Sequence, residues 1–106
     1  MSTHYQLHDA IAVITLDNAP LNELNHELRA GLAAGIDQAG ADARVEAVIL
    51  IGAGKAFSSG ADIREFNTPK TTAEPTLRSL IRIVDTSAKP VIAAIGGICM
   101  GGGLEL

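Results

Sequence analysis

Aromatic residues, cysteine and long apolar runs are all scarce in this chain of 106 residues. Aromatic side chains make up 3% of the chain and tryptophan is missing, so aliphatic side chains and alanine must fill any core. A single cysteine excludes an internal disulfide and favours a reducing, cytoplasmic compartment, with an organellar matrix or peroxisome as the eukaryotic equivalent. No apolar stretch approaches the roughly 18–20 residues that span a membrane, and residues 1–8 contain no signal-peptide core. We therefore expect no membrane partner.

Positive charge is also sparse. The chain has 8 Lys and Arg against 12 Asp and Glu residues, a net charge of −4, and no basic cluster, so we expect no nucleic-acid partner. An apolar fraction of 47% with 19% charged residues is typical of a globular domain. The three histidines are scattered without metal-ligand spacing, so no metal site is predicted. Cys99 lies in an apolar stretch and is interpreted as a small core residue rather than a nucleophile.

Hydrophobic patterning predicts three strands and a hairpin. Residues 10–17 form a β-branched run, and residues 5–8 are its expected hairpin partner, turning at Asp9. Residues 45–51 and 91–95 are short and mostly apolar, which suits strands covered on both faces of a parallel sheet.

Two segments between these strands have helical periodicity. Residues 23–39 carry an apolar stripe and follow Asn22, which is predicted to be the N-cap. Residues 75–87 form the second predicted helix, with Pro75 in its first turn. Alternating strands and helices indicate an α/β fold with parallel strands.

Two glycine-rich loops, residues 52–60 and 96–103, each follow a predicted buried strand. Ligands gather at the carboxyl ends of parallel strands, so both loops are expected at one edge. The glycines at 101–103 would present N–H groups to a developing negative charge, with Glu105 nearby. Taken singly, each loop is also consistent with a plain turn, with Glu105 as a solvated acid and Asp62 as a helix N-cap. Neither a phosphate-binding P-loop nor the dinucleotide-binding glycine fingerprint fits the spacing.

Together the two loops resemble a known family. Residues 54–63 (Gly-Lys-Ala-Phe-Ser-Ser-Gly-Ala-Asp-Ile) resemble the first signature of the enoyl-CoA hydratase/isomerase (crotonase) superfamily. Residues 89–97, running on to 101–106 (Gly-Gly-Gly-Leu-Glu-Leu), resemble the second, and residues 21–24 resemble the entry to the first helix. The order and separation match, and the likeness is greatest to the hydratase part of multifunctional β-oxidation proteins. The resemblance implies a crotonase-like (ClpP/crotonase) fold of repeated ββα units, with residues 1–106 as the N-terminal part of a truncated domain.

The resemblance also implies residue roles. The backbone N–H groups of Ala61 and Gly102 would form an oxyanion hole, and Glu105 would be a catalytic acid/base. Residues 62–74 would form a mobile wall beside the acyl chain. The residues expected to bind the coenzyme A (CoA) thioester are Lys55, Ala56, Phe57, Ser59, Gly60, Ala61, Asp62, Ile63, Gly101 and Gly102. Because CoA is part of the substrate, no separate cofactor is expected.

The function expected from this resemblance is that of an acyl-CoA-binding lyase, which hydrates 2-enoyl-CoA thioesters in fatty-acid β-oxidation. The family's second catalytic glutamate would lie beyond Leu106, so the chain by itself is expected to carry an incomplete site. Other crotonase-family reactions (isomerisation, hydrolysis or decarboxylation) stay open, as does an inactive fragment or assembly-only subunit. The family's habit of assembly implies a trimer-based homo-oligomer or a segment of a larger multifunctional chain.

Overall fold

A four-stranded sheet organises the chain in a computed structural model that describes residues 2–101, 103 and 106. The strands lie in the order β1 (Thr3–His8), β2 (Ile11–Leu16), β3 (Ala47–Gly52) and β5 (Val91–Ala94). β1 and β2 form an antiparallel hairpin through Asp9, whereas β2–β3 and β3–β5 are parallel. The predicted hairpin and parallel strands are therefore confirmed.

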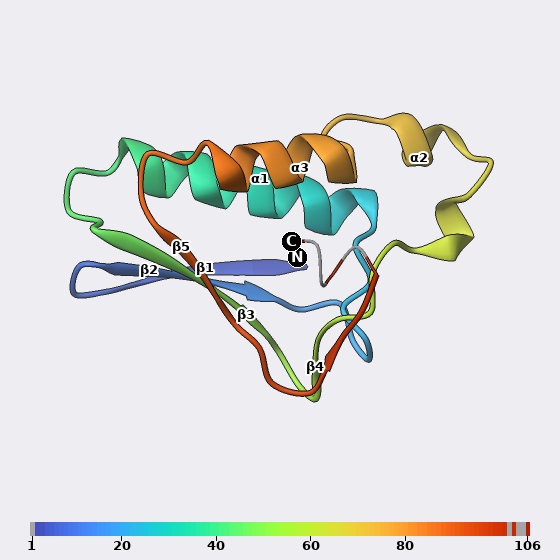
Figure 1. The fold of residues 1–106 in the computed structure, drawn as a ribbon, viewed down its shortest axis with the longest axis horizontal. Helices are drawn as coiled ribbons and strands as arrows, with labels where there is room; N and C mark the ends of the chain where they lie inside the picture. The colour runs from blue at the N-terminus through green and yellow to red at the C-terminus, as the bar shows by residue number, and fades with distance from the viewer. Residues whose placement is uncertain (1, 102, 104–105) are drawn as a thin grey trace.

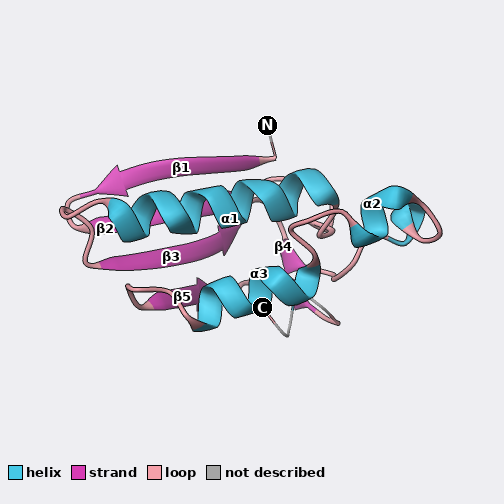
Figure 2. Cartoon of the chain, turned by 90° about the horizontal axis from the view of Figure 1, so that it is seen from above, coloured by secondary structure: helices cyan, strands magenta, loops and turns pink. Residues whose placement is uncertain are grey.

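The two longer helices, α1 (His26–Ala41) and α3 (Leu77–Asp85), cover the same face of this sheet (Figure 1). Figure 2 shows them side by side from above, with α3 nearer β5. The predicted apolar stripe of α1 is buried because it faces the alternate, inward-pointing side chains of β2. The buried hydrophobic side chains of these two elements are Ala12, Ile14, Leu16, Leu28, Leu32, Ile36 and Ala39. Cys99 packs against this core, as predicted.

The prediction that Asn22 is the N-cap of the first helix is wrong. The helix begins later, and Asn25 is its cap, because the Asn25 side chain accepts a hydrogen bond from the Leu28 N–H at 2.8 Å. Asn22 is instead fully buried at a backbone φ of 52°. Its amide group donates to the carbonyls of Ala53 and Ala56 at 3.1 and 2.8 Å, which ties the approach to α1 to the first glycine-rich loop.

The second helix also starts later than predicted, and Pro75 does not lie in its first turn. Thr76 is the N-cap of α3, and its hydroxyl accepts from the Ser79 N–H at 3.1 Å. Pro75 stands just outside the helix, where its carbonyl accepts a hydrogen bond at 2.8 Å from Arg29 of α1. A local cap and a long-range contact therefore set this boundary.

Both predicted loops contain a short strand, which local patterning does not reveal. β4 (Ala56–Ser58) and β6 (Ile98–Cys99) pair in parallel as a separate two-stranded sheet. Residues 62–74, the expected wall, hold a short 3₁₀ helix, η1 (Ile63–Glu65), and a one-turn helix, α2 (Pro69–Thr72). The order β1-β2-α1, then β3-β4 followed by α3, then β5-β6, confirms the predicted repetition of ββα units.

Candidate active site

The pairing of β4 with β6 brings the two glycine-rich loops together, as the sequence predicted for the edge at the carboxyl ends of β3 and β5. Ala56 is in register with Ile98, and Ser58 with Cys99. The Met100 N–H extends the contact by donating to the Ser58 carbonyl at 3.0 Å. Because backbone groups make this junction, its geometry depends on how closely the two loops approach each other.

Glycine is required at two points of this junction. A Cβ atom at Gly97 would lie 1.9 Å from the Lys55 carbonyl oxygen, and Gly97 also has a φ of 81°. A Cβ atom at Gly103 would lie 2.3 Å from the Ser58 carbonyl oxygen. No side chain fits at such distances, so these glycines permit the close backbone approach.

The peptide between Gly60 and Ala61 has its carbonyl anchored, and its N–H has no acceptor among the described residues. The Leu24 N–H donates to the Gly60 carbonyl at 2.7 Å. In a trans peptide the C=O and N–H bonds point in opposite directions, so this anchor also fixes where the Ala61 N–H points. Among residues 2–101, 103 and 106, the Ala61 N–H donates no hydrogen bond, and Ala61 is exposed. The structure thus leaves one oriented backbone donor at the surface.

The other two predicted catalytic residues, Gly102 and Glu105, lie outside the described residues. Gly101 precedes them at the exposed end of the second loop, and the Gly103 N–H donates to the Met100 carbonyl at 2.9 Å. Their roles therefore stay predictions.

The remaining residues expected to bind CoA divide into buried and exposed groups. Ala56 and Phe57 are each 1% exposed, so almost none of either residue, backbone included, is accessible to a ligand in this structure. The Ser59 N–H is already bonded to the Leu21 carbonyl at 3.0 Å. Lys55 and Ile63 are exposed, and Ile63 is 70% accessible. Their contacts with CoA stay predictions.

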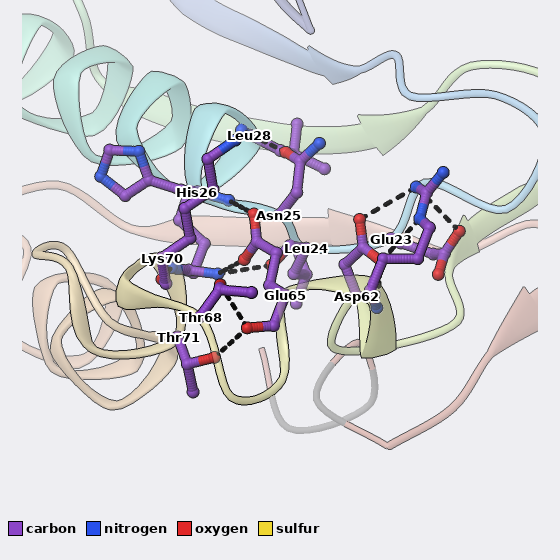
Figure 3. Close-up of polar contacts among 12 residues, drawn as sticks. Glu23, Leu24, Asn25, His26, Leu28, Asp62, Glu65, Thr68, Lys70 and Thr71 are labelled. Carbon is purple, nitrogen blue, oxygen red and sulfur yellow. Dashed lines mark hydrogen bonds and ion pairs between the residues drawn. The ribbon is translucent and has the colours of Figure 1, made fainter.

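Asp62 acts as a helix N-cap, the alternative that the sequence left open for its side chain. It caps η1 by accepting from the Arg64 N–H at 2.9 Å, and the Arg64 guanidinium bonds both of its carboxylate oxygens. These bonds to Arg64 hold the pKa of Asp62 below its usual value, against the opposing effect of burial. Figure 3 shows Asp62 and Glu23 facing the same guanidinium.

Two hollows lie along the first glycine-rich loop and the residues that follow it. The larger, about 550 Å³ and open to solvent, lies between the ends of β3 and β5 and includes Lys55 and Gly97 in its lining. The smaller, about 150 Å³, lies beside Ala61 and is bounded in part by the apolar side chains of Leu24, Phe66 and Leu77. The Ala61 N–H therefore lies at the edge of a partly apolar recess.

Sequence reasoning missed a buried ion pair in the wall of the smaller hollow. Arg29 and Glu65 are 4% and 9% exposed, and Nη1 of Arg29 lies 3.1 Å from Oε1 of Glu65. Neither residue has a spacing that signals this contact, because α1 and η1 meet only in the folded chain. The local sequence therefore gives no sign that distinguishes Arg29 from a solvent-exposed helix residue.

Two general features of the described residues complete this account. Within the described part of the chain, no group of three His, Cys, Asp or Glu side chains is placed to hold a metal ion. None of the helices assigned to these residues combines the length and apolarity that crossing a membrane would need.

Comparison with known proteins gives matches over almost the whole chain. A model of the enoyl-CoA hydratase/isomerase family matches residues 6–106. The chain is 40% identical over 106 residues to the human peroxisomal bifunctional enzyme, covering all of this chain and 14% of that protein. It is also 40% identical over 101 residues to a probable enoyl-CoA hydratase of Bacillus subtilis, covering 91% of this chain and 39% of the relative.

The fold matches as well. A crystal structure of an enoyl-CoA hydratase/carnithine racemase from Magnetospirillum magneticum superimposes with a TM-score of 0.87 at 39% identity, over 98% of this chain and 42% of that one. The chain thus spans less than half the length of these relatives.

Proposed function

Because the chain belongs to the enoyl-CoA hydratase/isomerase family of enzymes and has its crotonase-like fold, we propose that it forms the front part of an acyl-CoA-binding lyase. The reaction is the addition of water to a 2-enoyl-CoA thioester in fatty-acid β-oxidation. The length and name of the human relative support a place in a longer, multifunctional chain, which would share that protein's peroxisomal type of compartment.

The observation that carries this proposal is the oriented N–H of Ala61, which donates no hydrogen bond within the described part of the chain. A thioester carbonyl gains negative charge as bonds change at its α- and β-carbons, and a backbone donor already aimed at that oxygen needs no rearrangement. Removing one such donor in comparable enzymes costs about 2.7–4 kcal/mol of transition-state stabilisation. Gly102, as the second donor, would come from the facing loop, which β4 and β6 bring alongside the first.

The two hollows suggest how the substrate lies across this donor. We place the CoA portion along the larger, open hollow, where the Lys55 ammonium is exposed and suited to a phosphate. The acyl portion enters the smaller recess, where Leu24, Phe66 and Leu77 offer an apolar part of the wall to hydrocarbon and the charges of Arg29 and Glu65 are paired with each other. The thioester carbonyl would then lie between the two, beside Ala61.

The chemistry requires water at the β-carbon and a proton at the α-carbon. A carboxylate beside these carbons orients the water or transfers the proton, and Glu105 is the residue proposed for this role. The polarised carbonyl draws electron density from the double bond, so the β-carbon becomes the point of attack. No separate cofactor takes part in this scheme, because the activated thioester is supplied by the substrate.

The test is the hydration of crotonyl-CoA by the complete protein, followed by the loss of absorbance of the conjugated thioester. We expect turnover by the wild-type protein and its loss in Glu105→Gln. Glu46→Gln is the matched control, because Glu46 is exposed and lies in the approach to β3. A protein that binds crotonyl-CoA without hydrating it would favour another reaction of the family, and one that neither binds nor hydrates it would refute the proposal.

A further inference from the structure

Arg29 has a buried side chain, and its guanidinium donates hydrogen bonds to four acceptors from three parts of the chain. It is 4% exposed. Its Nη1 donates to the Leu24 carbonyl at 2.8 Å and to the Glu65 carboxylate at 3.1 Å. Its Nε and Nη2 donate to the carbonyls of Pro75 and Lys70, each at 2.8 Å. The planar guanidinium therefore holds the approach to α1 against the wall formed by residues 62–74 and against Pro75, which follows it.

Glu65 completes this arrangement from the opposite side. Its Oε1 accepts from Arg29, and its Oε2 accepts at 2.9 Å from the His26 N–H, the first free donor of α1 (Figure 3). A carboxylate at a helix N-terminus is favoured by the helix dipole. Thr68 and Thr71 in turn donate through their hydroxyls to the Glu65 backbone carbonyl. Both partners of the ion pair are thus fixed by neutral hydrogen bonds as well.

Leu24 connects this pair to the candidate oxyanion donor. Its carbonyl accepts from Arg29 at 2.8 Å, and its N–H donates to the Gly60 carbonyl at 2.7 Å. That carbonyl belongs to the same peptide plane as the Ala61 N–H, and the backbone of Leu24 and Ala61 forms a parallel bridge. A displaced Leu24 would therefore turn the donor at Ala61.

We infer that Arg29 and Glu65 are positioning residues for the reaction, which aim the Ala61 N–H at the thioester oxygen through the backbone of Leu24. The inference rests on the proposed function. Both side chains lie in the wall of the smaller recess, but the contribution inferred here is the orientation of the Gly60–Ala61 peptide, which they influence through Leu24. Misplacement of a catalytic group by about 1 Å costs on the order of 100-fold in rate, so a small rotation is sufficient.

A purely structural role makes a different prediction. Buried ion pairs often add little net stability, and an exchange that leaves the fold intact would then leave the chemistry intact. A positioning role requires directed hydrogen bonds. Lysine keeps the charge of Arg29 but has a single ammonium, which cannot reach the acceptors of Leu24, Lys70 and Pro75 in the geometry of the planar fork.

The experiment compares Arg29→Lys and Glu65→Gln with Arg44→Lys in the complete protein. Arg44 is the control because its ion pair with Asp42 is on the surface, with the Arg44 side chain 75% exposed. We expect kcat for crotonyl-CoA hydration to fall by about tenfold to 100-fold in the first two variants, with KM changing by less than about threefold. Oxyanion stabilisation acts mainly in the transition state, so a weaker oxyanion donor should lower kcat and leave KM nearly unchanged. Arg44→Lys should leave both constants unchanged.

A second measurement reports the donor itself, by infrared difference spectroscopy of a bound enoyl-CoA labelled at the thioester carbonyl. The carbonyl band should shift to lower frequency in the wild-type protein and by less in Arg29→Lys and Glu65→Gln. Unchanged kcat, or reduced kcat with a full wild-type band shift, would overturn the inference while the proposed function stands. A wild-type protein with no hydration activity would instead refute the proposed function. If Arg29→Lys fails to fold, Glu65→Gln decides the question alone.

Discussion

Replacing Asn22 with alanine should destabilise the protein far more than removing a helix cap. The Asn22 side chain is fully buried and makes three hydrogen bonds: it accepts from the Asn18 N–H at 2.8 Å and donates to the carbonyls of Ala53 and Ala56. Each bond contributes about 1 kcal/mol, and alanine at a φ of 52° costs about 1 kcal/mol more. We therefore expect Asn22→Ala to lower the free energy of unfolding by about 3–4 kcal/mol.

Asn25→Ala is the matched variant, because Asn25 is the true cap of α1 and makes one side-chain bond to the Leu28 N–H. Loss of an N-cap costs about 1 kcal/mol. Urea unfolding followed by circular dichroism measures both variants under the same conditions. Asn22→Asp adds a second check, since the acceptor is kept and the two donated bonds are lost. If Asn22→Ala cost no more than Asn25→Ala, the proposed role of Asn22 would be refuted.

Three further predictions concern the glycine junction, the end of α1 and acid stability. Gly97→Ala should lower the free energy of unfolding in urea by at least about 2 kcal/mol, because its Cβ would lie 1.9 Å from a backbone carbonyl oxygen. Gly40→Ala in α1 should instead raise it by about 0.5–1 kcal/mol, because a Cβ there meets nothing within 4 Å. Equal effects of the two variants would contradict the close approach at Gly97. Lys89→Met should lower the free energy of unfolding by about 2 kcal/mol, because the Lys89 ammonium donates to three carbonyls at and after the C-terminus of α1. A change below about 0.5 kcal/mol would contradict this role of Lys89. The side-chain hydrogen bonds from Arg44, aided by its backbone N–H, lower the pKa of Asp42 from 3.8 to about 2. The folded state then binds this proton more weakly than the unfolded state, so its stabilising effect is full above about pH 4 and is lost as the pH falls to about 2. Asp42→Asn should flatten that part of a stability-against-pH curve, and a curve of wild-type slope would contradict the assignment.

Local patterns were sufficient for the elements that local physics determines. The stripe of α1 and the alternation in β2 bury the predicted side chains, because helix and strand periods follow directly from backbone geometry. The α/β architecture followed from the order of those elements. The resemblance in the two glycine-rich loops also led to the family that the comparisons show.

Contacts between distant segments could not be predicted in the same way. Asn22 and Asn25 are equally good caps on local grounds, and only the carbonyls of Ala53 and Ala56 distinguish them. β4 and β6 are too short to give a periodic signal, and their pairing depends on glycines that admit a facing backbone. Arg29 is buried because residues 62–75 fold over it, which no spacing along α1 indicates.

The most direct test of the central claim is to replace the Ala61 N–H by an oxygen atom, which cannot donate a hydrogen bond. Replacing Ala61 with L-lactic acid in the complete protein converts the amide to an ester and deletes this donor. The N–H makes no hydrogen bond within the described residues, so the only bond affected there is the one from the Leu24 N–H to the Gly60 carbonyl, which the ester weakens but keeps. Stability should therefore fall only modestly, whereas kcat for crotonyl-CoA hydration should fall by about 100-fold to 1,000-fold. The same exchange at Ser59, whose N–H is bonded to the Leu21 carbonyl, should chiefly lower stability. A wild-type kcat in the Ala61 ester would contradict the account.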